Sequence, residues 1–192
     1  ASWINFWSAT SAYYHALRGE TDKIPEIFSQ HRLSAVNMLV PGKPMMEMIE
    51  NQVYLAQGAY AKVVGRSTEL LAVCDGMHYA LVALHIRIQT AAAYEMLGKT
   101  EEAHALLAKA LSDAAPDGFV MPFVENYGYL EQMLAREIRN GLITRIIELG
   151  EAAKRRKEES ARPPAFAALT QREFEIVTLI AQRLSNREIA EK

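Results

Sequence analysis

A glycine recurs at nearly constant spacing along most of this chain, and this spacing restricts the fold more than any other feature. Gly19, Gly58 and Gly98 are 39 and 40 residues apart, and Gly141 follows 43 residues later in a weaker copy. Each of the first three glycines separates the end of one helical segment from the polar start of the next. Glycine suits the left-handed residue that ends a helix before a tight reversal. The spacing therefore predicts helical hairpins that bury their apolar faces by stacking into a solenoid.

The rest of the pattern is also helical. Apolar residues recur at helical spacing almost everywhere and strand signals are scarce, so we expect an all-α fold of about four antiparallel helix pairs. The predicted helices span residues 2–17, 22–38, 44–57, 60–73, 77–97, 100–114, 121–139 and 142–157. Pro25 falls in the first turn of its predicted helix, where proline is tolerated. A charged run followed by Pro163-Pro164 predicts a linker at 159–168, between a repeat domain at 1–158 and a C-terminal segment at 169–192.

Composition excludes several classes of protein. The net charge of −2 and the pI near 6.3 argue against strong binding of nucleic acid by this chain alone. The single cysteine, Cys74, rules out an internal disulfide framework and favours a reducing compartment. No basic segment precedes an apolar stretch in the way that predicts a signal peptide, and the longest uncharged stretch, residues 1–17, is too polar to span a membrane.

The C-terminal segment contains two similar six-residue stretches, of which the first is Leu-Thr-Gln-Arg-Glu-Phe, starting at Leu169. Thr170 is suited to cap a helix, and Glu173 can reach back to the backbone N–H of the cap, which makes a capping box. Leu169 and Phe174 have the spacing of a hydrophobic staple. We therefore predict a helix that starts at Gln171.

The second copy, Leu-Ser-Asn-Arg-Glu-Ile, starts at Leu184. Ser185 and Glu188 repeat the capping box, and Leu184 and Ile189 repeat the staple. A second helix is therefore predicted from Asn186. Two short helices joined by a tight turn are typical of a helix-turn-helix.

Catalytic and metal motifs are absent from the sequence. Gly98-Lys99-Thr100 lacks the leading glycine of a phosphate loop, because Ala93 stands in its place. The histidines His15, His31, His78, His85 and His104 show no zinc-ligand spacing, and no nucleophile triad or carboxylate pair is recognisable. We therefore expect neither an enzyme nor a metal site.

Two clusters allow a structural and a functional interpretation. The basic run at residues 154–157 is interpreted first as a solvated helix end, where positive charge is favoured, and second as a patch attracted to DNA phosphates. The methionines Met45, Met46 and Met48 suit core packing better than an adaptable ligand surface.

The C-terminal segment closely resembles the start of the LuxR-type helix-turn-helix. The matching residues are Leu169, Thr170, Arg172, Glu173, Glu175, Ile176 (where the pattern has valine), Leu179, Ile180, Ala181, Leu184, Ser185, Asn186, Glu188, Ile189, Ala190 and Lys192. In that family a third helix follows and enters the major groove of DNA. The resemblance implies a truncated DNA-binding module that lacks its reading helix. Its caps and scaffold residues would be Thr170, Arg172, Glu173, Ser185, Asn186, Arg187 and Glu188.

The repeats resemble the tetratricopeptide signature, although their period is longer than the usual length of about 34 residues. The residues that carry this resemblance are Tyr94, Gly98, Ala103, Leu107 and Ala110, then Tyr54, Gly58, Tyr60, Val63 and Leu70, with Ser67 where a large apolar residue is usual. Helical repeats, a proline-containing linker and a LuxR-type segment together resemble the MalT-like large regulators, as does the stretch 118–125. The resemblance implies an NTPase module, and with it ATP, upstream of this chain, and no cofactor within it.

In tetratricopeptide arrays the first helix of each hairpin lines a concave surface where partners bind. By this resemblance the candidate effector-binding residues are Met45, Met48, Gln52, His85, Ile88, Glu95, Glu125 and Gln132. This mix of side chains suits a small molecule or a peptide helix.

We therefore expect the cytoplasmic signal-sensing domain of a MalT-like, LuxR-family transcriptional regulator with a tetratricopeptide-like superhelix. Binding of a small-molecule or protein effector would change self-association, and the complete C-terminal domain would then bind DNA. No membrane contact is expected. The alternatives are a tetratricopeptide-type protein-binding scaffold without a transcriptional role and, less favoured, an all-helical enzyme.

Overall fold

The computed structural model describes residues 6–33, 39–161, 169–181 and 188, and this part of the chain is all-α, without a strand. Two compact units are formed, Ala1–Lys154 and Arg155–Lys192. The helices of the first unit are α1 (Phe6–Arg18), α2 (Glu26–Ser29), α3 (Lys43–Ala56), α4 (Tyr60–Gly76), α5 (Ala80–Met96), α6 (Thr100–Ala114), α7 (Met121–Glu125), α8 (Tyr127–Arg136) and most of α9 (Gly141–Ala161). The second unit contains α10 (Gln171–Ala181). Within the described residues, no helix has both the length and the apolar character needed to cross a membrane.

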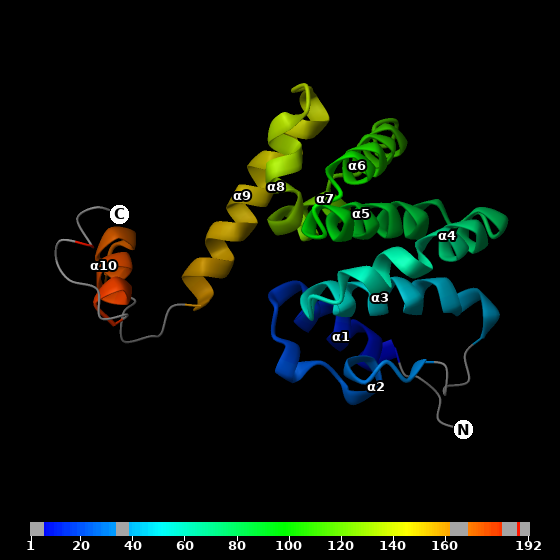
Figure 1. The fold of residues 1–192 in the computed structure, drawn as a ribbon, viewed down its shortest axis with the longest axis horizontal. Helices are drawn as coiled ribbons and strands as arrows, with labels where there is room; N and C mark the ends of the chain where they lie inside the picture. Colours follow the sequence, from blue (N-terminus) through cyan, green and yellow to red (C-terminus); the bar gives the residue numbers. More distant parts are fainter. Residues whose placement is uncertain (1–5, 34–38, 162–168, 182–187, 189–192) are drawn as a thin grey trace. The chain divides into compact units, whose positions relative to one another are not determined.

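Neighbouring helices of the first unit pack side by side. The first helices of successive hairpins, α1, α3 and α5, form one layer, in which α3 contacts both α1 and α5 (Figure 1). The second helices, α4 and α6, pack against α5 from the two hairpins to which they belong. Adjacent helices are antiparallel, as the sequence predicts. Helix α5 is thus covered both by its own hairpin partner and by the preceding hairpin.

The predicted glycine turns are confirmed. Gly19, Gly58 and Gly98 have φ angles of 72°, 73° and 73°, in the left-handed region. At each of them the next residue donates a backbone hydrogen bond back across the helix end, as Ala59 N does to Tyr54 O at 2.8 Å. This bond marks the Schellman ending, which satisfies helix carbonyls that would otherwise lack a donor.

Three further helix ends use the same turn, and the sequence analysis missed them. His31 ends α2 with φ 55°, His78 ends α4 with φ 56° and Gly118 ends α6 with φ 65°. Tyr79 N and Phe119 N donate the corresponding hydrogen bonds, to Cys74 O at 2.9 Å and to Ala114 O at 3.2 Å. Left-handed residues therefore lie every 20 residues from Gly58 to Gly118, one per helix.

The prediction that Gly141 forms a fourth turn of this kind is wrong. Gly141 is the first residue of α9 and is not among the residues with positive φ. The preceding Asn140 starts this helix instead, because its side-chain oxygen accepts a hydrogen bond from Ile143 N at 2.9 Å.

The prediction of one helix over 22–38 is also wrong for residues 22–33. Residues 34–38 lie outside the described residues. A 3-10 turn, Thr21–Lys23, and the single helical turn α2 take the place of the predicted helix. Ile24 is extended, with ψ 128°, because a residue before proline is disfavoured in the α region. Pro25 therefore lies at the N-cap of α2 and not within a longer helix.

Other predicted bounds shift at helix ends. The predicted helix 121–139 divides at Asn126, whose side-chain amide donates to Pro122 O at 3.0 Å while its backbone N donates to Phe123 O. A side chain that bonds the backbone in this way competes with the helical ladder. The helix expected from 77 begins only at Ala80, because Met77 and His78 close α4. Residues 159–161, assigned to the linker, belong to α9, and 162–168 lie outside the described residues.

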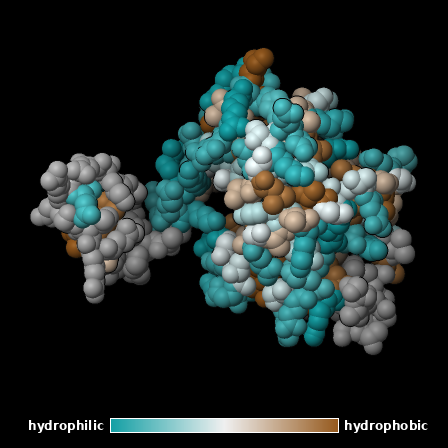
Figure 2. Space-filling model, in the orientation of Figure 1, coloured by the Kyte–Doolittle hydropathy of each residue, from teal (hydrophilic) through white to brown (hydrophobic). Residues whose placement is uncertain are grey.

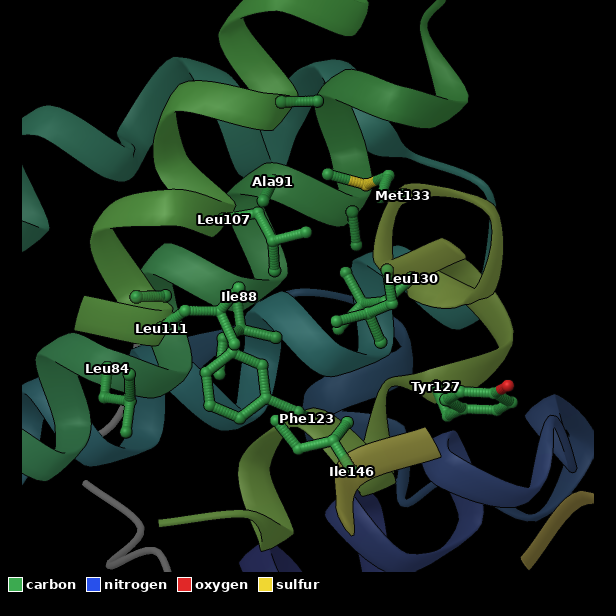
Figure 3. Packing of buried hydrophobic residues seen from close by; sticks show 14 of the residues in the cluster. Leu84, Ile88, Ala91, Leu107, Leu111, Phe123, Tyr127, Leu130, Met133 and Ile146 are labelled. Atoms are coloured by element: carbon green, nitrogen blue, oxygen red, sulfur yellow. The ribbon is translucent and has the colours of Figure 1, made fainter. Parts of the chain in front are cut away.

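Two apolar clusters form the core. One joins α1, α2, α3 and α4 with the start of α5, and the other extends from the end of α3 through α5 and α6 to α9. In the second cluster Leu107 of α6 lies between Ile88 and Ala91 of α5 in the view of Figure 3, and Phe123 of α7 and Leu130 of α8 complete the packing. Helices α3, α4 and α5 contribute residues to both clusters and so join the two parts of the core.

Candidate functional site

Three polar side chains from distant parts of the sequence meet in the first unit. The Tyr13 hydroxyl of α1 donates a hydrogen bond to Glu125 Oε2 of α7 at 2.7 Å. His85 Nδ1 of α5 lies 3.4 Å from the Tyr13 oxygen and 3.9 Å from Glu125 Oε2. We call these three residues the Tyr13 cluster. It links α1, at the start of the unit, to α7 by way of α5.

The surrounding helices fix each member of the Tyr13 cluster. Ala12 and Ala16 anchor α1 in the apolar core on either side of Tyr13 in the sequence, and Leu84 and Ile86 do the same for His85. Glu125 is the last residue of α7, directly after the buried pair Phe123 and Val124. The cluster is therefore positioned by packing and is not free to rearrange alone.

Burial controls the ionisation of the cluster. Desolvation lowers the pKa of His85 from 6.5 to about 4, so the imidazole is neutral at pH 7. Desolvation also raises the pKa of Glu125, although the hydrogen bond from Tyr13 opposes this rise. Burial, followed by the nearby carboxyl of Glu125, raises the pKa of the Tyr13 phenol, which stays protonated. Among the described residues, no lysine or arginine forms an ion pair with Glu125.

A second polar contact joins α3 and α5 deeper in the unit. The Gln89 amide donates to Gln52 Oε1 at 2.9 Å and to the backbone oxygen of Met48 at 3.1 Å. All three residues are buried. Because a buried amide is costly unless it is hydrogen-bonded, this contact fixes the register of α3 against α5.

The structure brings together only some of the predicted effector-binding residues. His85 and Glu125 meet in the Tyr13 cluster, and Met48 and Gln52 share the contact with Gln89. Ile88 is fully buried in the apolar core, so a ligand would reach it only if neighbouring helices separated.

The other three predicted residues, Met45, Glu95 and Gln132, do not belong to the Tyr13 cluster. Met45 and Gln132 are exposed. Glu95 is largely buried, with Oε1 3.6 Å from Nη1 of Arg136.

Sequence reasoning missed Tyr13, although a signal for it existed. Tyr13 lies six residues before Gly19, just as Gln52 lies six residues before Gly58. Tyr13 therefore has the same repeat position as Gln52, which is one of the predicted effector-binding residues.

A further network that was missed surrounds the buried carboxylate of Glu50. Arg66 of α4 forms an ion pair with it, and His31 Nδ1 lies 3.7 Å from Glu50 Oε1. The His31 ring stacks on Tyr54, with 4.0 Å between ring centroids and 17° between the ring planes. His31 itself has φ 55° and ends α2. This network holds α2, α3 and α4 together, which is a structural role.

The start of α10 matches the predicted capping box. Thr170 N donates to Glu173 Oε2 at 2.7 Å, and Glu173 N donates to Thr170 Oγ1 at 3.3 Å. Hydrogen bonds from Thr170 lower the pKa of the exposed Glu173 carboxyl. Arg172 and Glu188 are exposed, whereas the predicted residues Ser185, Asn186 and Arg187 lie outside the described residues.

Comparison of the chain with protein-family models, with curated proteins and with solved structures finds no match. Within the described residues, no group of three or more His, Cys, Asp or Glu side chains is placed to hold a metal ion.

Proposed function

We propose that this chain is the signal-sensing repeat domain of a MalT-like, LuxR-family transcriptional regulator. In this proposal α1 to α9 form a tetratricopeptide-like superhelix, and α10 is the first helix of the DNA-binding domain. The left-handed turns every 20 residues and the antiparallel neighbours support the superhelix. The two compact units support a separate C-terminal module.

One observation carries the proposal: α10 begins at Gln171 behind a reciprocal cap between Thr170 and Glu173. This is the helix start that the LuxR-type sequence pattern of residues 169–192 implies. In the proposed module the positive end of the α10 dipole is suited to attract a DNA phosphate. In that family base recognition belongs to the third helix, and the resemblance of residues 169–192 covers the first two helices.

The Tyr13 cluster is the proposed effector site of the sensor. Its three side chains are half-buried, and its carboxylate is paired with a phenol and a neutral imidazole. An effector that hydrogen-bonds Glu125 would compete with Tyr13 and release α1 from α7. The switch requires the effector to bind the released state better than the tied one, since ligands shift an equilibrium only by differential affinity.

Selection from a random DNA pool tests the DNA-binding half of this proposal. The complete natural polypeptide that contains residues 1–192 is expected to enrich a defined DNA sequence, and residues 1–192 alone are expected to enrich none. Failure of the complete polypeptide to enrich any sequence would refute the regulator. A peptide ligand captured in a parallel peptide-display selection would then favour the scaffold.

Selection of a DNA sequence by residues 1–192 alone would contradict the assignment of base recognition to a third helix. Thr170→Ala and Glu173→Ala are expected to weaken the binding of the complete polypeptide. Thr144→Ala, on the exposed side of α9, is the matched control.

A further inference from the structure

The left-handed glycines place α1, α3 and α5 in one common register. The residues twelve positions before Gly19, Gly58 and Gly98 are Trp7, Met46 and Ile86. The residues five positions before the same glycines are Tyr14, Val53 and Ala93. Because seven residues are two helical turns, the two positions lie on the same face of each helix.

This face is buried in α3 and α5 but open in α1. Met46 and Ile86 are 9% and 0% exposed, whereas Trp7 is 79% exposed. Val53 and Ala93 are both 0% exposed, whereas Tyr14 is 53% exposed. Phe6 is exposed as well, but it lies about 100° around the helix from Trp7, and its equivalent in α3, Met45, is exposed too. We call Trp7 and Tyr14 the α1 aromatic face.

The preceding hairpin is what covers this face in α3 and α5. Met46 and Val53 belong to the same apolar cluster as Ala12 and Phe28, which lie in α1 and α2. Ile86 of α5 belongs to this cluster together with Leu70 and Cys74 of α4. The equivalent face of α1 therefore has the position at which one more hairpin would pack.

The opposite end of the array has a different character. On α9 the side chains of Thr144, Arg145 and Glu148 are exposed, and Arg145 and Glu148 form an ion pair at 3.5 Å. Stacked-repeat proteins need such polar outer faces on their terminal units. The last hairpin meets this requirement, and α1, with Trp7 and Tyr14 exposed on its outer face, does not.

We propose that the α1 aromatic face is the docking surface for a further antiparallel helix pair of the same polypeptide. This pair packs on α1 as α1 and α2 pack on α3. The exposed polar side chains of Thr144, Arg145 and Glu148 argue against the α9 end of a second copy as the occupant, since they do not match the aromatic rings. The inference goes beyond the proposed function, because it holds equally for a sensor and for a scaffold.

Hydroxyl-radical footprinting of the complete natural polypeptide tests this inference on native side chains. Trp7 and Tyr14 are expected to lose modification to the low level of the buried Tyr127, relative to the rates measured on the unfolded chain. Met121, which is exposed at the start of α7, is the internal control that stays reactive. Full reactivity of Trp7 and Tyr14 would overturn the proposal. Protection that disappears on dilution would also overturn it, because the cover would then be a second molecule.

A charge placed on this face provides an independent test in the same polypeptide. Trp7→Glu is expected to lower the melting temperature because it buries a carboxylate against the docked pair, and Trp7→Phe is expected to restore most of the loss. Ile138→Glu is the matched control, since Ile138 is 89% exposed in the α8–α9 turn, whose apolar tip lies at the top of Figure 2. Equal melting temperatures for Trp7→Glu and Ile138→Glu would contradict a covered face.

Discussion

The ring of Tyr127 occupies the space that a side chain at Gly150 would need. A Cβ built on Gly150 would lie 2.3 Å from Cγ and from Cδ2 of Tyr127. Contacts this short do not occur between carbon atoms that are not bonded, and the ring of Tyr127 is itself buried in the core. The absence of a side chain at position 150 therefore allows α8 and α9 to approach this closely.

Gly150→Ala is therefore expected to lower the free energy of unfolding by about 1–3 kcal/mol, because overpacking forces the two helices apart. Alanine is otherwise the better helix former, by about 1 kcal/mol, so the steric effect must exceed that gain. Gly65→Ala is the matched control, because the added Cβ meets no atom within 4 Å in the middle of α4. Chemical denaturation of the two variants checks the prediction. A stabilised Gly150→Ala variant would contradict the close approach.

The helix ends at Gly98 and His78 predict opposite effects of substitution. Gly98→Val is expected to destabilise the protein by about 1–2 kcal/mol, because its φ of 73° is unfavourable for a branched side chain. His78→Gly is expected to stabilise it by up to about 1 kcal/mol, because His78 adopts φ 56° with a side chain. Thermal unfolding measures both variants. A loss of stability in His78→Gly would show that its side chain makes a contact worth more than the strain.

The buried imidazole of His85 predicts a loss of stability in acid. Its pKa is about 4 in the folded protein and 6.5 in the unfolded chain, so the unfolded chain binds a proton first as the pH falls. The contribution of His85 is present above pH 6.5 and is lost towards pH 4, by about 3 kcal/mol in all. His85→Gln should flatten the dependence of the unfolding free energy on pH in this range.

Glu125 contributes with the opposite sign, because its pKa is raised in the folded protein. Its contribution is present below the unfolded pKa and is lost as the pH rises through the folded pKa. The pH dependence should therefore be measured in Glu125→Gln as well as in His85→Gln. An unchanged slope in His85→Gln would argue that His85 is solvated.

The cap of α10 predicts a local effect in the second unit. Thr170→Ala is expected to weaken α10 by about 1 kcal/mol, because the N-cap loses its side-chain oxygen. Thr170→Ser should behave like the natural protein. Hydrogen exchange of the backbone amides in α10 measures the effect, and unchanged exchange in Thr170→Ala would show that the cap does not stabilise the helix.

Local rules in the sequence were enough to predict the helix ends that glycine or a capping box marks. Gly58 and Gly98 are left-handed because this conformation has no Cβ penalty in glycine, and Thr170 and Glu173 lie within reach of each other because they start a helix. The left-handed turn at His78 was not predicted, because histidine does not mark a helix end as glycine does. His78 nevertheless lies midway between Gly58 and Gly98, 20 residues from each.

Long-range contacts account for another part of what was missed. His85 and Glu125 were selected from their helix faces, but the hydrogen bond between Tyr13 and Glu125 joins residues 112 positions apart. No local pattern encodes that distance. The break at Ile24 and Pro25 does have a local signal, because proline disfavours the α region for the residue before it. The helical spacing of apolar residues over 22–38 obscures this signal.

The regular 20-residue interval between left-handed turns also affects how the fold tolerates changes in length. One residue inserted within α4 would rotate the remainder of that helix by about 100° and misplace its apolar side chains. The turn at His78 then starts α5 afresh, because a left-handed residue resets the helical phase. Damage from an insertion or deletion is thereby confined to one helix and its immediate neighbours, and an array of this kind can change in length without losing its remaining hairpins.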